Sequence, residues 1–160
     1  MIPEPGHPQN PLVQSRIIIG ALASGCVIFA AVAIVISLTQ GPFMPDPQMS
    51  MILAGLAGAV LLGALVASFV VARVFARQAG RAAADQPTPE EGERTIAAHY
   101  AQCLVIRGAL AQGPSLFCIT VFMLTGMWGV LAGALVGLAE FAMLFPSEGR
   151  QRAFMSRALE

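Results

Sequence analysis

The sequence has little charge, and it has no lysine at all. Charged residues make up 11% of the 160 residues, against about 25% in ordinary soluble domains, while apolar residues make up 56%. So little charge argues against a soluble domain of this size. The nine acidic residues balance nine basic ones, which excludes a bulk attraction to nucleic acid or to anionic lipid. The composition predicts an integral membrane protein.

The sequence also lacks the motifs that carry catalysis or hold cofactors. It contains no nucleophile elbow, no glycine-rich phosphate loop, no HExxH and no paired catalytic carboxylates. Its cysteines, Cys26, Cys103 and Cys118, have neither CxxC nor Cys/His ligand spacing, so they support neither a disulfide framework nor a zinc site. His99 has no second histidine at ligand spacing, and beside Tyr100 it is typical of an anchor at a membrane border. We expect no enzyme, no cofactor and no metal site.

Four apolar runs are long enough to cross a membrane. A bilayer core about 30 Å thick takes about 20 residues at 1.5 Å each. The runs are residues 17–38, 51–72, 108–124 and 127–145, and the last of them holds a charge, Glu140. The first run is too long for a signal peptide and has no Lys or Arg before Arg16, so we expect it to be retained. The sequence therefore predicts an all-α protein with four transmembrane helices.

The segments outside these runs differ in character. We expect a flexible Pro-rich tail over 1–15, a four-helix bundle over 16–146 and a C-terminal tail over 147–160. Prolines make the connection 40–48 a short irregular loop. The last two runs are separated by Thr125-Gly126 alone, which predicts a tight antiparallel hairpin.

The longest connection, residues 73–107, extends the second and third helices out of the membrane. Arg73, Arg77 and Arg81 recur every four residues, which gives the second helix a basic face beyond its apolar run. Thr88-Pro89-Glu90-Glu91 is typical of a helix start, with Thr88 as the N-cap, Pro89 in the first turn and Glu91 closing a capping box. We therefore expect the third helix to begin near Pro89, well before the membrane.

The arginines give the four predicted spans an orientation. With four spans, the two tails and the 73–107 connection lie on one side of the membrane, and they carry all nine Arg. The positive-inside rule makes that side cytoplasmic. Arginine without lysine, together with abundant Ala and Gly, is typical of a GC-rich bacterial genome. We expect a bacterial inner-membrane protein with both termini in the cytoplasm.

Small residues at every fourth position mark the faces where membrane helices approach closely. Such residues lie on the second run and on the fourth run: Gly55, Ala59, Gly63, Ala67, Gly129, Gly133 and Gly137. They serve either packing inside one bundle or self-association and contact with other membrane proteins. Gly113-Pro114 in the third run predicts a kink, because proline removes a hydrogen bond and clashes with the carbonyl of Leu110. That kink is either a fixed bend or a gating hinge.

One polar level lies inside the predicted membrane. Glu140 follows the Gly126 turn by 14 residues and Gln112 precedes it by 14, so both lie about 21 Å from the turn at 1.5 Å per residue. Arg107 lies about 7 Å nearer the cytoplasm, within reach of its long side chain. Glu140 also lies about 20° from Gly133 around its helix, toward the packed side. We expect a cluster of Arg107, Gln112 and Glu140, either a polar clamp between helices or a proton- or cation-binding site.

The C-terminal part of the chain resembles a known group of sequences. Residues 106–117 read IRGALAQGPSLF, residues 124–126 read LTG and residues 145–150 read FPSEGR. This stretch of about 45 residues resembles small uncharacterised bacterial four-helix membrane proteins. In these, the third helix reads roughly R-x-A-L-x-E-G-x-x-x-F and the last ends in F-P-[ST]-x-x-R. The resemblance implies a family and no activity.

The same third-helix segment is also similar to the ion-carrying helix of rotary ATPase proteolipid (c-type) subunits, which reads A-x-x-E-[ST/G]-x-x-x-[FY]. The ion-binding carboxylate of that family falls on Gln112, and glutamine cannot release a proton. The proteolipids alternate Gly every second residue, whereas Gly55 to Ala67 repeats small residues every fourth. The resemblance therefore does not carry a rotor role over to this helix.

Three functions follow as hypotheses. The first is a non-catalytic structural, accessory or assembly component of the membrane, whose partners are the lipid bilayer and other membrane helices. The second is a proteolipid-like ion-translocating subunit that uses Glu140. The third is a small transporter that acts as an oligomer, since four spans without an inverted repeat do not make a transporter alone.

Overall fold

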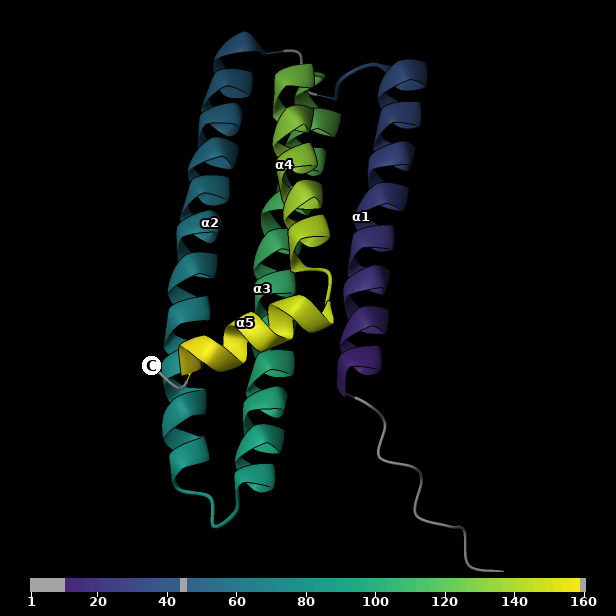
Figure 1. The fold of residues 1–160 in the computed structure, drawn as a ribbon. Coiled ribbons are helices and arrows are strands. Elements are labelled where there is room, and N and C mark those ends of the chain that lie inside the picture. Colours follow the sequence, from purple (N-terminus) through teal and green to yellow (C-terminus); the bar gives the residue numbers. More distant parts are fainter. Residues whose placement is uncertain (1–10, 44–45, 159–160) are drawn as a thin grey trace, which may run out of the picture.

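The structure, a computed structural model, describes residues 11–43 and 46–158, and within these ranges the chain forms helices and no strand. The helices are α1 (Pro11–Gln40), α2 (Pro47–Ala84), α3 (Pro89–Thr125), α4 (Trp128–Leu144) and α5 (Glu148–Ala158). Figure 1 shows α1 to α4 lying side by side, while α5 crosses α2 and α3. The α-helical class predicted from the sequence is confirmed.

Three helices are long and apolar enough to cross a membrane. They are Val13–Gln40 with 28 residues, Pro47–Ala84 with 38 and Pro89–Thr125 with 37. α4 is also apolar, but with 17 residues it is shorter. By length and composition, the protein therefore belongs to the class of α-helical membrane proteins.

The helix starts follow the local sequence signals. The predicted N-cap of α3 is confirmed, because Thr88 Oγ1 accepts from the Glu91 N–H at 3.3 Å. The Glu91 side chain differs from the predicted capping box: its Oε2 accepts from the Thr88 hydroxyl at 3.0 Å, whereas a capping box has it accept from the Thr88 backbone N–H. α2 starts in the same way, because the Asp46 carboxylate accepts from the Gln48 N–H at 2.9 Å. Capping satisfies backbone donors that the helix itself leaves unpaired.

Both ends of the chain depart from the expected tails. α1 begins at Pro11, so residues 11–15 are helical, and the rest of the predicted N-terminal tail lies outside the described residues. The predicted C-terminal tail is replaced over Glu148–Ala158 by α5. This short helix has no apolar run. It is placed by a tertiary contact, because Phe154 packs on Tyr100 and Leu144.

α3 is the central helix of the molecule. Of its apolar stretch 44% is buried, against 17% for α1 and 11% for α2, and α3 contacts α1, α2, α4 and α5. Ile119 and Phe122, fully buried, lie at the centre of the larger apolar cluster. A helix that is buried on several faces positions its neighbours, so the side chains of α3 are where the other helices meet.

The turn between α3 and α4 requires glycine. Gly126 has a φ of +69°, which L side chains rarely adopt, and its N–H donates to the Phe122 carbonyl at 2.7 Å. A Cβ at this position would lie 3.3 Å from Pro42 Cβ in the connection between α1 and α2. The backbone therefore reverses direction tightly at Gly126 and packs against the neighbouring connection.

Candidate functional site

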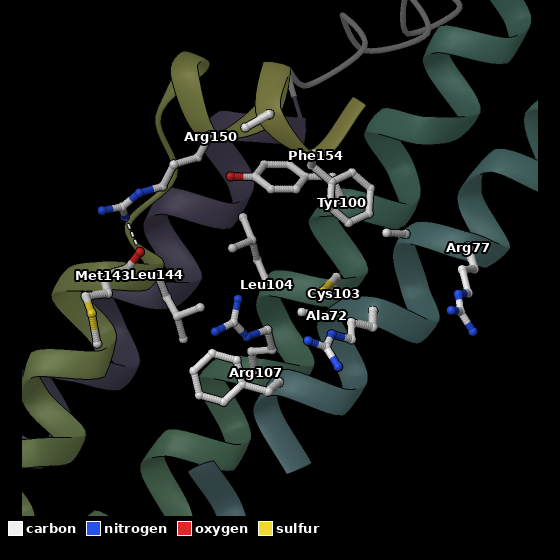
Figure 2. Close-up of a pocket in the computed structure, with 14 residues that line it drawn as sticks. Ala72, Arg77, Tyr100, Cys103, Leu104, Arg107, Met143, Leu144, Arg150 and Phe154 are labelled. Atoms are coloured by element: carbon white, nitrogen blue, oxygen red, sulfur yellow. Dashed lines mark hydrogen bonds between the residues drawn. The ribbon is translucent and has the colours of Figure 1, made fainter. Parts of the chain in front are cut away.

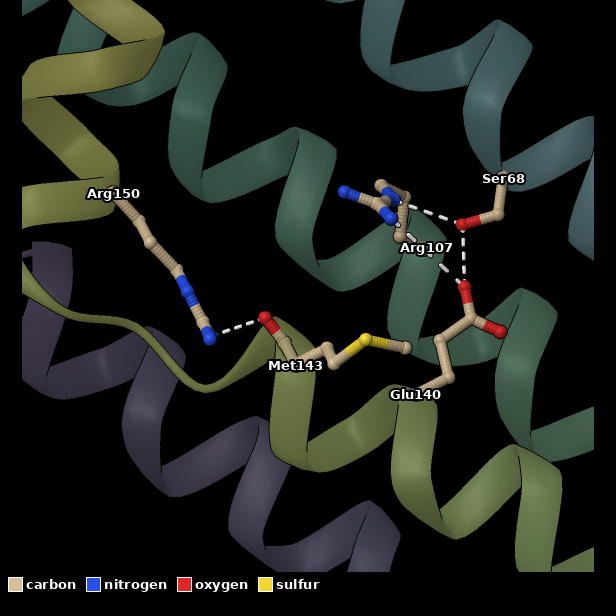
Figure 3. Close-up of polar contacts among 5 residues, drawn as sticks. All are labelled: Ser68, Arg107, Glu140, Met143 and Arg150. Atoms are coloured by element: carbon tan, nitrogen blue, oxygen red, sulfur yellow. Dashed lines mark hydrogen bonds and ion pairs between the residues drawn. The ribbon is translucent and has the colours of Figure 1, made fainter.

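Three helices each contribute one polar side chain to a network inside the bundle. Ser68 of α2 donates its hydroxyl to Glu140 Oε1 of α4 at 2.6 Å. Arg107 of α3 donates from Nε to Ser68 Oγ at 2.8 Å, and its Nη2 lies 4.0 Å from Glu140 Oε1 (Figure 3). We call Ser68, Arg107 and Glu140 the polar clamp. It joins α2, α3 and α4 at one level.

In the polar clamp the carboxylate of Glu140 is buried, whereas the side chain of Arg107 is partly exposed. Ser68 is 1% exposed and Glu140 5%, whereas the Arg107 side chain is 24% exposed. A carboxylate taken out of water must be paired, because an unpaired buried charge is very costly. Here the serine hydroxyl and the guanidinium together provide that pairing, and the hydroxyl bridges Arg107 to the carboxylate. The arrangement holds a negative charge in place and neutralises it.

The structure brings Arg107 and Glu140 together but leaves Gln112 out of the network. Gln112 is half-buried, and within the described residues it makes no hydrogen bond with Arg107 or Glu140. It follows Arg107 by five residues, so it points about 140° away around α3 at 100° per residue. Gln112 and Glu140 lie at a similar depth in the bundle, but Gln112 is on a different side of α3 from Arg107 and so does not face Glu140. Ser68 stands in the place expected for Gln112.

Ser68 was not among the residues expected from the sequence, although a signal for it exists. It is the one polar residue in the run 51–72. A hydroxyl in an apolar span faces a polar partner when one is within reach, because such hydrogen bonds join helices where water is absent. The sequence marks Ser68 as polar, but the rotation of α2 that turns it toward Glu140 comes from tertiary packing.

Two of the three glycines repeated on α4, Gly133 and Gly137, are packed inside the bundle. A Cβ at Gly137 would collide with Ser115 Oγ and lie 3.3 Å from the Ala111 carbonyl oxygen. A Cβ at Gly133 would lie 3.0 Å from Cys118 Sγ. α4 can therefore approach the backbone of α3 closely at these two positions. Gly129 differs, because it is exposed and a Cβ there would meet nothing within 4 Å.

Most of the small residues repeated on α2 face outward from the bundle. Gly55, Ala59 and Gly63 are exposed, and a Cβ at either glycine would meet nothing within 4 Å. Ala67 is half-buried. Packing inside the bundle, which was one of the two interpretations of this repeat, does not account for Gly55, Ala59 and Gly63. We call these three residues the outer face of α2.

The Gly113-Pro114 pair does not interrupt α3. Pro114 is buried inside the helix and Gly113 is exposed. The next residue, Ser115, donates its hydroxyl to the Ala111 carbonyl at 2.7 Å, four residues back. The helix continues to Thr125. The pair lies beside the place where Gly137 of α4 approaches Ser115.

The class of the protein is defined by this geometry. It is an α-helical protein with three helices long and apolar enough to cross a membrane, and two of them, α2 and α3, are joined to α4 by the polar clamp. Comparisons of the chain with protein-family models, curated proteins and solved structures find no match.

Proposed function

We propose that the chain is a non-catalytic integral protein of a bacterial inner membrane, which crosses the bilayer four times and serves as a structural, accessory or assembly component. The observation that carries this proposal is the polar clamp. Its carboxylate receives the Ser68 hydroxyl and lies beside the Arg107 guanidinium. A carboxylate that is already neutralised by the chain itself joins helices and is not free to bind a transported cation.

The lengths of the helices support four spans with cytoplasmic extensions. At 1.5 Å per residue α2 and α3 measure about 55 Å, well beyond a bilayer core of about 30 Å. α4 measures about 26 Å and suffices to cross with its turn. Arg16 Nε at the start of α1 donates to the Pro146 carbonyl at 3.2 Å, so these two chain regions lie at one level. Figure 1 has the start of α1 and the α2–α3 connection toward one end of the bundle, which agrees with an Arg-rich cytoplasmic side.

The outward surfaces support contact with lipid. Large apolar side chains on α1 and α2 are exposed, among them Ile17, Ile28, Leu38, Leu62, Val66 and Phe69. A surface of this kind is solvated by acyl chains and not by water. The outer face of α2 lies on the same side of that helix as several of these side chains. An accessory or assembly component needs a face for another membrane helix, and small residues allow such close approach.

A carbodiimide that modifies protonated carboxyl groups tests the proposal. The wild-type protein in nanodiscs is treated at neutral pH and modification of Glu140 is measured by peptide mass spectrometry. We expect no selective modification, because the carboxylate is buried and paired with Ser68 and Arg107. Arg107→Gln is the positive control, since it removes the paired cation. The Glu140→Gln variant gives the background.

The rival function makes the opposite prediction for the same measurement. An ion-translocating subunit that uses Glu140 would show selective modification of wild-type Glu140, suppressed by a cation or by high pH. That result would overturn the structural interpretation of the polar clamp. A reporter fused after Asp46, in the connection between α1 and α2, tests the topology separately: a cytoplasmic reporter there would contradict the proposed orientation.

A further inference from the structure

A pocket of about 720 Å³ lies beside the polar clamp, between α2, α3 and the chain from the end of α4 into α5 (Figure 2). Four arginines line it: Arg73 and Arg77 from α2, Arg107 from α3 and Arg150 from α5. We call this cavity the arginine pocket. Its lining, taken over the described residues, includes no Asp or Glu. The whole chain has no net charge, yet this place concentrates positive charge.

Two of the four guanidinium groups are engaged by the protein. Arg107 donates to Ser68 and its Nη2 lies 4.0 Å from Glu140 Oε1, as part of the polar clamp. Arg150 Nη1 donates to the carbonyl oxygens of Met143 and of Phe145, the latter at 3.0 Å, so it closes the end of α4. Arg107 keeps unused N–H groups, because a guanidinium has five donors.

The other two guanidinium groups have no partner within the described part of the chain. Arg73 and Arg77 are exposed, and neither takes part in an ion pair or a side-chain hydrogen bond there. They are four residues apart, so they lie on one face of α2. Like charges at this spacing repel one another, and an anion between them would relieve the repulsion.

A buried hydroxyl without a partner lines the same pocket. Tyr100 is 6% exposed, and its hydroxyl has no hydrogen-bond partner in the described structure. Its ring packs against Phe154 of α5 at 5.2 Å between centroids. Figure 2 shows the hydroxyl directed toward the Arg150 side of the pocket. Buried hydroxyl groups are ordinarily paired, so this one points to a ligand with an acceptor oxygen.

The arginine pocket also has an apolar side. Leu104, Leu144 and Phe154 line its interior. Phe69 and Met143 line it too, and these side chains are 69% and 62% exposed, so they extend from the pocket to the outer surface. A ligand that satisfies both sides carries a negative charge and an apolar chain.

We propose that the arginine pocket binds one anionic phospholipid from the cytoplasmic leaflet. Its phosphate lies in the pocket that Arg73 and Arg77 line from α2 and Tyr100 from α3, and its acyl chains leave past Phe69 and Met143. This inference rests on the proposed membrane topology, which places the arginines at the cytoplasmic headgroup level. Basic pockets between membrane helices on that side bind phosphate headgroups, and guanidinium groups match phosphate oxygens in pairs.

The test measures lipid binding to the intact protein by native mass spectrometry. The full chain in detergent is titrated with phosphatidylglycerol or with phosphatidylcholine of the same acyl chains. We expect one phosphatidylglycerol to bind in preference to phosphatidylcholine. Arg73→Gln with Arg77→Gln should weaken that binding about thirty-fold, from two lost arginine contacts. Tyr100→Phe, which keeps the ring, should weaken it by a smaller factor.

A matched double variant controls for the loss of charge. Arg81 and Arg152 are exposed and do not line the arginine pocket. Arg81→Gln with Arg152→Gln therefore removes the same charge and should leave the affinity for phosphatidylglycerol unchanged. Equal weakening in both double variants would overturn the proposal, because the attraction would then be a general charge effect. Equal binding of the two lipids by the wild type would overturn it as well.

Inorganic phosphate separates a lipid from a soluble anion. It shares the phosphate chemistry but lacks the acyl chains, so we expect it to compete poorly. Phosphate that displaces the lipid at comparable concentration would contradict the lipid assignment. Alkaline carbonate extraction of membranes tests the proposed function on its own: a chain that stays in the membrane but shows no lipid preference refutes this inference alone. A chain that is released refutes the membrane proposal.

Discussion

α2 and α4 carry the same sequence pattern and use it in opposite ways. Both have small residues at every fourth position, yet Gly133 and Gly137 of α4 approach α3 closely, while Gly55 and Gly63 of α2 meet nothing. The pattern shows that a helix can be approached closely. It does not show from which side, because that depends on how the helix is rotated in the bundle. On α2 the rotation is coupled to Ser68, which points inward to the polar clamp.

The largest loss of stability should come from substitutions in the polar clamp, because its side chains hold the inner faces of α2 and α4 together. Arg107→Gln leaves the Glu140 carboxylate, 5% exposed, without its cation. We expect a loss of about 3–5 kcal/mol in the free energy of unfolding, as for other broken buried pairs. Unfolding in mixed detergent micelles, followed by circular dichroism, measures it.

Glu140→Gln is the informative partner to that variant. It leaves a charged Arg107, but this side chain is 24% exposed and can extend toward the headgroups. The loss should therefore be smaller than for Arg107→Gln. An equal loss in the free energy of unfolding for the two variants would contradict this expectation, because it would mean that the greater burial of Glu140 does not affect stability. Arg81→Gln, an exposed site outside the polar clamp, serves as the control.

A smaller effect should come from the packed face of α4. Gly137→Ala places a methyl group against Ser115 Oγ and near the Ala111 carbonyl, so the two helices must separate. We expect a destabilisation of about 1–3 kcal/mol, the usual result of overpacking. Thermal unfolding of the variant beside wild type measures it. Gly129→Ala on the same helix is the matched control, because a Cβ there is unobstructed.

The smallest effect on folding should come from the outer face of α2. Gly55→Ala with Gly63→Ala adds methyl groups where nothing lies within 4 Å, so packing should not oppose the change and the higher helix propensity of alanine should stabilise the protein by about 0.5–1 kcal/mol per site. The pair tests association separately from folding. If another helix binds this face, bulkier Gly55→Leu and Gly63→Leu should reduce crosslinking in membranes. A folding defect in the alanine pair would contradict the described rotation of α2.

The sequence predicted the parts of this architecture that depend on neighbouring residues. The N-cap residue Thr88 predicted the start of α3, and the regular rise of a helix placed Arg107 and Glu140 at compatible depths on either side of Gly126. Depth alone also selected Gln112, which lies on a different face of α3. Ser68 and α5 escaped prediction because tertiary contacts place them: the first by the rotation of α2, the second by Phe154 against Tyr100.

The lengths of α2 and α3 have a mechanical consequence. From Ser68 to the end of α2 at Ala84, the helix extends about 24 Å past the polar clamp at 1.5 Å per residue. α3 runs beside it, and α5 lies across both (Figure 1). The two helices thus extend together from the level of Ser68 and Arg107, and α5 contacts both of them beyond that level. A tilt of a few degrees at this level moves the far ends of the helices by about an ångström or more, so the hydrogen bonds of the polar clamp set the position of the connection at Asp85–Thr88.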